Sequence, residues 1–460
     1  MSKSVLRSFF EYIWLPFRQA FDRIKNDEIK KNLLQAIPFW IASLITGIVA
    51  VLYSRLFLLA EGFAKSIFEL NSLFLFFLTP ACFIISWWLV RQFAVYAKGS
   101  GIPQVMASID MSARKTNAIV DKLLGFKIVI VKVASSLVMA AGGGAIGREG
   151  PTIQIAASIF RIVNERLPAW IPKIAKKNVI VTGAAAGLAA AFNTPLGGIV
   201  FAIEELTKTH FSFYKTAIFS SVIIAGLTAQ WLIGPYLYLG YPQVSDLSLW
   251  IIAPVMLVSV FSGISGGVMS KLILGILIWK SKLKLASHHV FYALFCGLAI
   301  AGVAHFFSTE IMGSGKETME LALFSDDKYS NWYTPILRIA GPILSFTSGG
   351  AGGIFAPALG AGASIGSVIS GWFSLSESST NLVILAGMVG FLTGVTRSPF
   401  TSAILVLEMT DRHSVIFYLI LAGMIASVAA LFIDKHSLYD HLKHQYLNEL
   451  KHMDGEHNAK

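Results

Sequence analysis

The chain alternates long runs without a charged side chain and short clusters of charge. The runs that lack Asp, Glu, Lys and Arg span residues 32–54, 178–203, 216–245, 247–270, 285–308, 339–376 and 413–433. Each is long enough to cross about 30 Å of hydrocarbon, which takes roughly 20 helical residues. Only 14% of the residues are charged and 55% are hydrophobic, which excludes a water-soluble domain. The chain is therefore predicted to be an all-α polytopic membrane protein.

Glycine and proline interrupt several of these runs, most densely at residues 142–151, Gly-Gly-Gly-Ala-Ile-Gly-Arg-Glu-Gly-Pro. Broken helices are tolerated in a bilayer only where the backbone lines a cavity inside the protein. The proline suits the first turn of a helix, and the unpaired N–H groups of a helix start attract anions. Glu149 would compete with a dissolved anion for these donors, so we interpret it as a gate that leaves the site when protonated. A surface glycine loop with an Arg–Glu ion pair would have the same sequence, and this stretch alone leaves both interpretations open.

The same plan occurs twice along the chain. The glycine-proline segment 147–151 is matched by 353–357. A turn that ends in proline, with a glutamate nine residues later, occurs at 193–204 and again at 397–408, and corresponding positions are about 205 residues apart. Transporters often consist of two inverted-topology repeats whose broken and re-entrant helices meet at a central site. We expect this architecture here, with half-helix N-termini around an anion.

We divide the chain into four parts on this basis. An amphipathic N-terminal helix (1–31) precedes the first membrane repeat (32–230), which is followed by the second membrane repeat (231–434) and a short C-terminal segment (435–460). Basic residues cluster before the first apolar run and after the last one. The positive-inside rule therefore predicts that both termini are cytoplasmic. Because the net charge of +11 is concentrated at these ends, we assign it to anionic lipid heads and predict no nucleic-acid partner.

Three further features carry candidate chemistry. The segment Gly-Ser-Gly-Ile-Pro at 99–103 is another glycine turn with a proline at a helix start, where Ser100 offers a hydroxyl donor. Glu204 and Glu205 end an apolar run and face different surroundings, since successive helical positions are about 100° apart. One of them is structural and the other a proton relay, and the residues alone do not say which. Lys132 is predicted to have a buried structural role that also raises the local potential for anions.

Other classes of site are not indicated. Cys82 and Cys296 lie far apart in apolar stretches, so we predict no disulfide, no metal site and no cofactor. The chain has no His-Glu-x-x-His zinc motif and no phosphate loop with its lysine, so it is not expected to be an enzyme. No short apolar segment with a small-residue cleavage site opens the sequence, and no cleaved signal peptide is expected.

The segments at 99–103, 147–151 and 353–357 resemble the signature sequences of the CLC chloride channel and transporter family, and Tyr439 resembles its inner-gate tyrosine. The resemblance runs from about residue 32 to 445. The motif residues that carry it are Gly99, Gly101, Pro103, Gly147, Arg148, Gly150, Pro151, Gly353 and Pro357. It implies a homodimer in which each subunit has its own anion pathway.

The resemblance also implies roles for individual residues. Ser100 and Tyr439 would bind the central anion through their hydroxyls, together with the backbone amides of Ile354 and Phe355. Glu149 matches the external gating glutamate of the family. These roles are implied by the resemblance to the family's motifs, and the spacing of the residues in this chain does not by itself assign them.

The resemblance further separates the two adjacent carboxylates. Glu205 matches the internal proton-transfer glutamate of the exchanger branch, a position that channel-type members usually fill with an uncharged residue. Serine in the first motif is similar to the chloride-preferring members, and the Glu-Gly-Pro ending of the second is unlike the fluoride-exporting branch. The chain ends at Lys460, so we expect no regulatory nucleotide-binding pair and a bacterial inner membrane protein.

The implied function is secondary active transport, in which chloride and protons are exchanged across the membrane. The alternative is a passive chloride-selective channel gated by Glu149.

Overall fold

The computed structural model describes residues 15, 16, 18, 19, 21–112, 117–168, 170–207, 215–234, 237–245, 247–373 and 375–458. Within these residues all regular structure is helical, apart from two isolated β-bridges. Eight helical segments in this part of the chain are long and apolar enough to cross a membrane. The prediction of an all-α protein with several membrane spans is confirmed.

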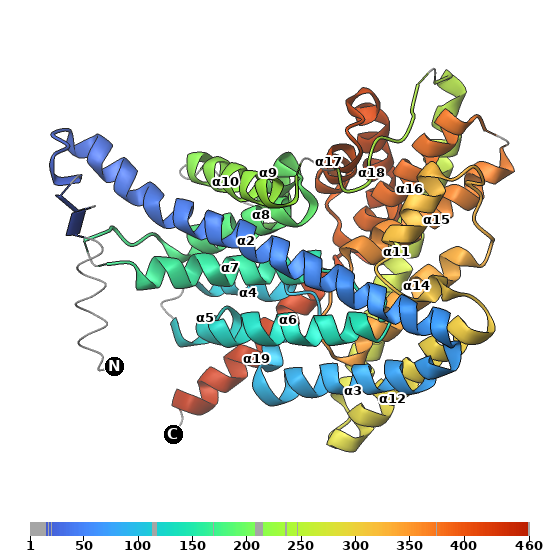
Figure 1. Cartoon of the computed structure of the whole chain (residues 1–460), viewed down its shortest axis with the longest axis horizontal. Coiled ribbons are helices and arrows are strands. Elements are labelled where there is room, and N and C mark those ends of the chain that lie inside the picture. The colour runs from blue at the N-terminus through green and yellow to red at the C-terminus, as the bar shows by residue number, and fades with distance from the viewer. Residues whose placement is uncertain are drawn as a thin grey trace.

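The first half opens with α2 (Asp27–Leu70), which runs diagonally across the molecule in Figure 1. It begins at Asp27 because the Asn26 side chain accepts hydrogen bonds from the N–H groups of Glu28 and Ile29. The remaining helices of this half are α3 (Leu75–Phe93), α4 (Ile102–Ser112), α5 (Asn117–Leu123), α6 (Phe126–Ala141), α7 (Glu149–Arg166), α8 (Lys176–Phe192), α9 (Pro195–Phe201), the π-helical turn η3 (Ala202–Thr207) and α10 (Lys215–Ile233).

The second half lies mainly on the right of the molecule as it is drawn in Figure 1. Its helices are α11 (Ile252–Ser281), α12 (Ala286–Phe306), α13 (Lys316–Phe324), α14 (Thr334–Ser348), α15 (Phe355–Trp372), α16 (Glu377–Thr396), α17 (Pro399–Thr410), α18 (Ile416–Leu431) and α19 (Leu438–Asn458). The two halves are interleaved at one edge, where α12 packs against α3.

The predicted repeat is visible in the breaks between helices. Asn193 follows the last residue of α8 and Arg397 follows the last residue of α16, and both lie in the left-handed region with φ of 57° and 63°. This conformation is uncommon for residues other than glycine, and a proline opens the next helix, α9 or α17, in both cases. The same interruption therefore occurs at matched positions in the two halves.

The inversion of one repeat relative to the other is visible where α9 and α17 meet. The carboxylate of Glu408, near the end of α17, accepts a hydrogen bond from the N–H of Gly197 at 2.7 Å, at the start of α9. In the reciprocal contact, Glu204 accepts one from the N–H of Thr401 at 2.6 Å, at the start of α17. Each helix end thus caps the beginning of the other, as a two-fold relation between antiparallel helices requires.

The first and last segments of the chain, residues 1–31 and 435–460, were expected to be an amphipathic helix and a charged tail. Residues 1–14, 17 and 20 of the expected amphipathic helix lie outside the described residues, and α2 already begins at Asp27, inside that segment. The C-terminal segment is not wholly a charged tail, because it forms α19, whose first residues Leu438 and Tyr439 are fully buried. Packing of α19 against α4 brings this turn into the protein core.

A polar turn between α18 and α19 fixes the start of α19. The Asp434 carboxylate accepts hydrogen bonds from the N–H of His436 at 2.9 Å and from Nε2 of His441 at 3.1 Å. Burial raises the pKa of Asp434, but these two contacts and the nearby Arg397 guanidinium lower it further, so the net pKa lies below its usual 3.8. The ionised carboxylate therefore helps to hold the turn that precedes Tyr439.

Candidate functional site

The glycine segments that are far apart in sequence meet at one point. Gly147 and Gly353 exchange a pair of backbone hydrogen bonds of 2.8 and 2.7 Å. The N–H of Gly99 donates to Gly350 O at 2.8 Å, and the N–H of Gly352 donates to Gly99 O at 3.1 Å. All three motifs identified in the sequence are thus joined directly through their backbones. The helices α7 and α15 begin at this junction.

Close contact at this junction requires glycine. A Cβ atom on Gly150 would collide with the Ser100 side chain and would lie 2.9 Å from Ser100 O. A Cβ atom on Gly147 would collide with the Glu149 carboxylate. Glycine is the residue that allows backbone to approach another group this closely. Substitution at either position would displace one of the predicted site residues.

Glu149 begins α7, and its carboxylate reaches the N-terminus of α15, where a competitor for an anion was expected. Its side chain is 1% exposed, and its carboxylate lies beside the backbone N–H of Ala356 in the first turn of α15. The hydroxyl of Tyr238 donates to Glu149 Oε1 at 3.5 Å. A helix N-terminus favours negative charge through its unpaired N–H groups and its dipole. The carboxylate thus occupies a position in which an anion would also be stabilised.

Four other predicted residues gather next to it. The hydroxyls of Ser100 and Tyr439 face each other and are both buried. The rings of Tyr439 and Phe355 are stacked, with centroids 6.2 Å apart. Ile354 and Phe355 form the start of α15, and neither N–H donates to an oxygen among the described residues. Two hydroxyls and two backbone donors therefore converge on one small region of the core.

A buried lysine supports the first of these loops. Lys132, on α6, is completely buried, and its ammonium donates to Gly99 O at 2.9 Å. The charge lies one residue from Ser100, so it also makes the local potential more positive. The structural role predicted for Lys132 is confirmed, since it holds the glycine loop in place.

The adjacent carboxylates Glu204 and Glu205 point into different surroundings, as expected. Glu204 caps α17 through Thr401, whose N–H and hydroxyl donate to it at 2.6 and 2.7 Å. Glu205 is 4% exposed and accepts a hydrogen bond from the Ser398 hydroxyl. Glu204 is therefore the one that caps the neighbouring helix, and Glu205 is the more buried of the two.

An aromatic contact connects the region of Glu205 with the anion region. Phe201 lies about one turn before Glu205, and its ring centroid is 6.3 Å from that of Phe355. Phe355 in turn stacks on Tyr439. Phe201, on the helix that leads to Glu205, is thus linked through Phe355 to the ring of Tyr439.

Two contacts of the site were not found from the sequence. The first is Tyr238, which contacts Glu149 and is 3% exposed. The centroid of its ring lies 5.0 Å from the ring centroid of Phe192 and 5.2 Å from the ammonium of Lys316. Tyr238 belongs to an irregular segment without hydrophobic periodicity, so the neighbouring sequence does not predict that Tyr238 contacts the site. Ser398, by contrast, occupies the turn that repeats Thr194 in the first half, and that match could have identified it.

The chain is similar in sequence and in fold to known membrane proteins. Residues 82–431 match the family model described as voltage gated chloride channel. The H(+)/Cl(-) exchange transporter ClcA of Cronobacter sakazakii (strain ATCC BAA-894) is 29% identical over 374 residues, covering 77% of this chain and 76% of that protein. A solved structure of a slow cyanobacterial Cl-/H+ antiporter has a TM-score of 0.76 and 23% identity, covering 90% of this chain and 98% of that one. A CLC-type fluoride/proton antiporter has a TM-score of 0.71 and 21% identity, with the same coverage.

Proposed function

Because the chain belongs to the voltage-gated chloride channel family, we propose that it is a secondary active transporter that exchanges chloride for protons across the membrane. Its relative from Cronobacter sakazakii is named as an exchanger of these two ions. The observation that carries the proposal is the burial of the Glu149 carboxylate at the N-terminus of α15, beside the N–H of Ala356. At that position one group binds a proton and also competes with an anion.

The anion is bound by the groups that converge there. The hydroxyls of Ser100 and Tyr439 and the backbone N–H groups of Ile354 and Phe355 donate hydrogen bonds to chloride. Backbone donors at a helix start bind an anion without placing a full positive charge next to it. Weak binding of this kind suits a transported ion, which has to leave again.

Coupling follows from the competition at Glu149. When the carboxylate is ionised, it takes the anion's place near Ala356. When it accepts a proton, its attraction to the helix N-terminus is lost, it leaves, and chloride enters. A proton therefore moves whenever the anion changes place, and the two ions are exchanged.

Glu205 relays protons between Glu149 and the solution on the inner side. It is buried and accepts a hydrogen bond from the Ser398 hydroxyl, which is not one of the anion donors. A path for protons that is separate from the path for chloride allows the two ions to move in opposite directions. In Glu205→Gln we expect chloride flux to continue while proton movement stops, whereas Glu149→Gln should pass chloride without coupling to protons.

The alternative function is a passive chloride-selective channel gated by Glu149. Purified protein in liposomes distinguishes the two, with voltage clamped by a potassium ionophore and a chloride gradient imposed. An exchanger moves protons against their own gradient under these conditions. Chloride movement without protons would support the channel and return Glu205 to a structural role.

The same proposal covers assembly and location. We expect a homodimer in a bacterial inner membrane, with two membrane repeats (32–230 and 231–434) and both termini in the cytoplasm. The basic residues at the chain ends support this orientation. No enzymatic activity is proposed, and the Gly-x-Ser-x-Gly strings at 263–267 and 362–366 lie inside α11 and α15 and not at a strand-to-helix turn.

A further inference from the structure

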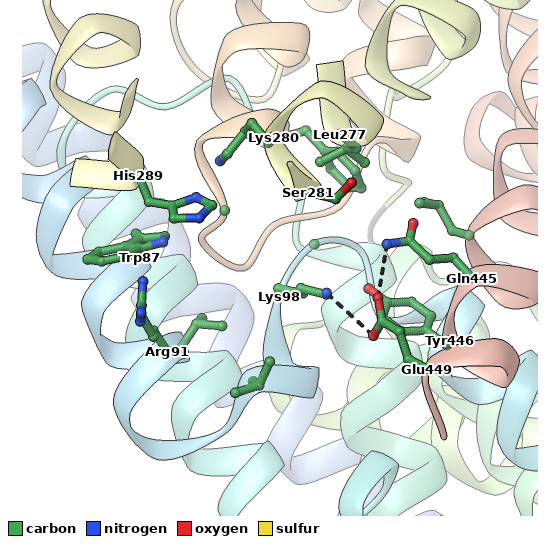
Figure 2. A pocket seen from close by; sticks show the side chains of 16 residues that line it. Trp87, Arg91, Lys98, Leu277, Lys280, Ser281, His289, Gln445, Tyr446 and Glu449 are labelled. Atoms are coloured by element: carbon green, nitrogen blue, oxygen red, sulfur yellow. Dashed lines mark hydrogen bonds and ion pairs between the residues drawn. The ribbon is translucent and has the colours of Figure 1, made fainter. Parts of the chain in front are cut away.

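A pocket of about 470 Å³ lies between α3, α11, α12, α14 and α19, behind the glycine loops of the anion site. Figure 2 shows the side chains that line it. Small-molecule sites in proteins usually have volumes of about 300–1,000 Å³, so this pocket is large enough for an organic ligand. None of the groups assigned to chloride or proton transfer points into it, apart from the backbone of Gly99.

One wall of the pocket is a stack of three planar side chains. Trp87 lies between His289 and Arg91 in Figure 2. The Trp87 and His289 rings are nearly parallel, with centroids 6.2 Å apart, and the Arg91 guanidinium lies 5.2 Å from the Trp87 centroid. Among the described residues, Arg91 has neither an ion pair nor a hydrogen bond. A guanidinium stacked on an aromatic face keeps its N–H edge free, and that edge fits the oxygens of a phosphate.

Two ammonium groups complete the positive lining. Lys280 donates to Thr347 O at 2.5 Å and to Ser348 O at 3.0 Å, which uses two of its three donors. Lys98 lies 3.9 Å from the Glu449 carboxylate, the pocket's single acidic side chain. Three basic side chains, those of Arg91, Lys98 and Lys280, thus line the pocket with one carboxylate, and the pocket favours an anionic ligand.

The remaining lining is largely apolar. It is formed by aliphatic and aromatic side chains of several helices, namely Val90, Val95, Leu277, Phe346 and Leu442. A bare inorganic ion would leave these side chains without a partner. A ligand that joins an anionic group to an apolar body would contact both kinds of surface.

We propose that this pocket binds a phosphate group carried on an apolar body, with the phosphate against the free guanidinium of Arg91. The chemistry is that of an anionic membrane lipid, and it is shared by soluble organic phosphates. The apolar lining favours the lipid. This binding does not depend on the transport activity proposed above.

A ligand in the pocket would lie against both loops of the anion site. A Cβ atom on Gly349 would lie 2.9 Å from Trp87 Cδ1, so the stack packs directly on the loop that leads to Ile354. Gly99, which precedes Ser100, also lines the pocket. Occupancy of the pocket therefore restrains the backbone that carries the anion donors.

The test uses the purified full chain in detergent, with dioleoyl phosphatidic acid as the probe and native mass spectrometry as the readout. Dioleoylglycerol has the same apolar body without the phosphate, and glycerol 3-phosphate supplies the phosphate without the apolar body. Arg91→Gln removes the free guanidinium, and Ser281→Trp fills the pocket from an exposed position at its edge. Lys282→Gln is the matched control, because Lys282 is an exposed cation at the same helix end that does not line the pocket.

We expect phosphatidic acid to bind saturably and dioleoylglycerol to bind much more weakly. Arg91→Gln should raise the dissociation constant about tenfold, since it removes hydrogen bonds between two charged groups, and Ser281→Trp should abolish binding. Saturable binding of glycerol 3-phosphate that Arg91→Gln also weakens would assign the site to a soluble phosphate. Equal binding of phosphatidic acid by the wild type, Arg91→Gln and Lys282→Gln, or no saturable binding of either phosphate, would overturn the proposal.

Discussion

Glu204 and Glu205 allow the account to be tested at two neighbouring positions. Replacing Glu204 by alanine removes three hydrogen bonds to the start of α17, from Phe400 N at 3.2 Å, Thr401 N at 2.6 Å and Thr401 Oγ1 at 2.7 Å. Loss of a helix N-cap costs about 0.5–2 kcal/mol, and hydrogen bonds to a charged group contribute about 1.5–3 kcal/mol. Because Glu204 is partly exposed, water replaces some of these bonds. We expect Glu204→Ala to lower the free energy of unfolding by about 2 kcal/mol.

The matched variant is Glu205→Gln, which keeps the shape of the side chain and an acceptor for the Ser398 hydroxyl. We expect its stability to stay within about 1 kcal/mol of the wild type, while proton movement is lost. The free energy of unfolding of both variants is measured in detergent, with intrinsic fluorescence as the signal. The proton and chloride fluxes of the same variants are measured in liposomes. In the flux assay, folded Glu204→Ala should still exchange both ions.

Two outcomes would refute this reasoning. One is a Glu204→Ala protein of unchanged stability that no longer moves protons, because the roles of the two carboxylates would then be reversed. The other is unchanged stability in Glu408→Ala, since Glu408 caps α9 through Leu196 N at 3.0 Å and Gly197 N at 2.7 Å. The reciprocal caps predict losses of similar size in the two alanine variants.

Three further changes have defined outcomes. Tyr238→Phe removes the hydroxyl that contacts Glu149 at the long distance of 3.5 Å, and we expect about a twofold rise in chloride flux, measured in liposomes, as the carboxylate leaves its site more readily. Gly150→Ala places a methyl group against Ser100, so chloride binding measured by calorimetry should be lost. Asp434→Asn should lower the melting temperature at pH 7, and its difference from the wild type should shrink as the pH falls below 3.8, because a carboxylate with a lowered pKa contributes stability only while it is ionised.

Each of these changes has a control. A Cβ atom on Gly275 meets no heavy atom within 4 Å, so Gly275→Ala should bind chloride like the wild type. The account of Gly150 fails if both alanine variants bind chloride equally. For Tyr238→Phe, an unchanged flux at every pH would mean that the hydroxyl does not hold Glu149. For Asp434→Asn, a difference in melting temperature that does not shrink as the pH falls below 3.8 would have another cause than the charge.

The sequence was sufficient for those parts of the site that depend on local backbone. A glycine run followed by a proline predicts a helix start whose N–H groups are unpaired, and all three such segments meet in the structure. The repeat of turn, proline and glutamate likewise predicted the matched breaks after α8 and α16. Such helix breaks can be predicted from adjacent residues, because glycine and proline act on the backbone conformation at their own positions.

Contacts between distant segments could not be read in this way. Apart from the family resemblance, Glu204 and Glu205 are told apart by their partners Thr401 and Ser398, almost 200 residues later in the chain. The inverted repeat was expected from the sequence, but the residues next to the two glutamates do not say which side chains of the second half become their partners. Tyr238 presents the same difficulty, since its contacts depend on where an irregular segment lies.

The burial of α19 could have been predicted but was obscured by charge. After Leu438, its buried residues recur every three to four positions along the helix, at Tyr439, Leu442, Tyr446 and Leu450. This is the spacing of one helix face. The charged side chains between them made the segment resemble a solvent-exposed tail, and periodicity was the better guide.

Coupling in the reverse direction tests the proposed exchange most directly. Liposomes containing the purified protein hold equal chloride on both sides, a proton gradient is imposed, and the voltage is clamped near zero with a potassium ionophore. The account predicts that protons moving down their gradient drive chloride in the opposite direction against a growing chloride gradient, and that Glu205→Gln abolishes this movement. A chloride concentration that stays equal on both sides, in protein that still passes chloride down a gradient, would contradict the account and identify a channel.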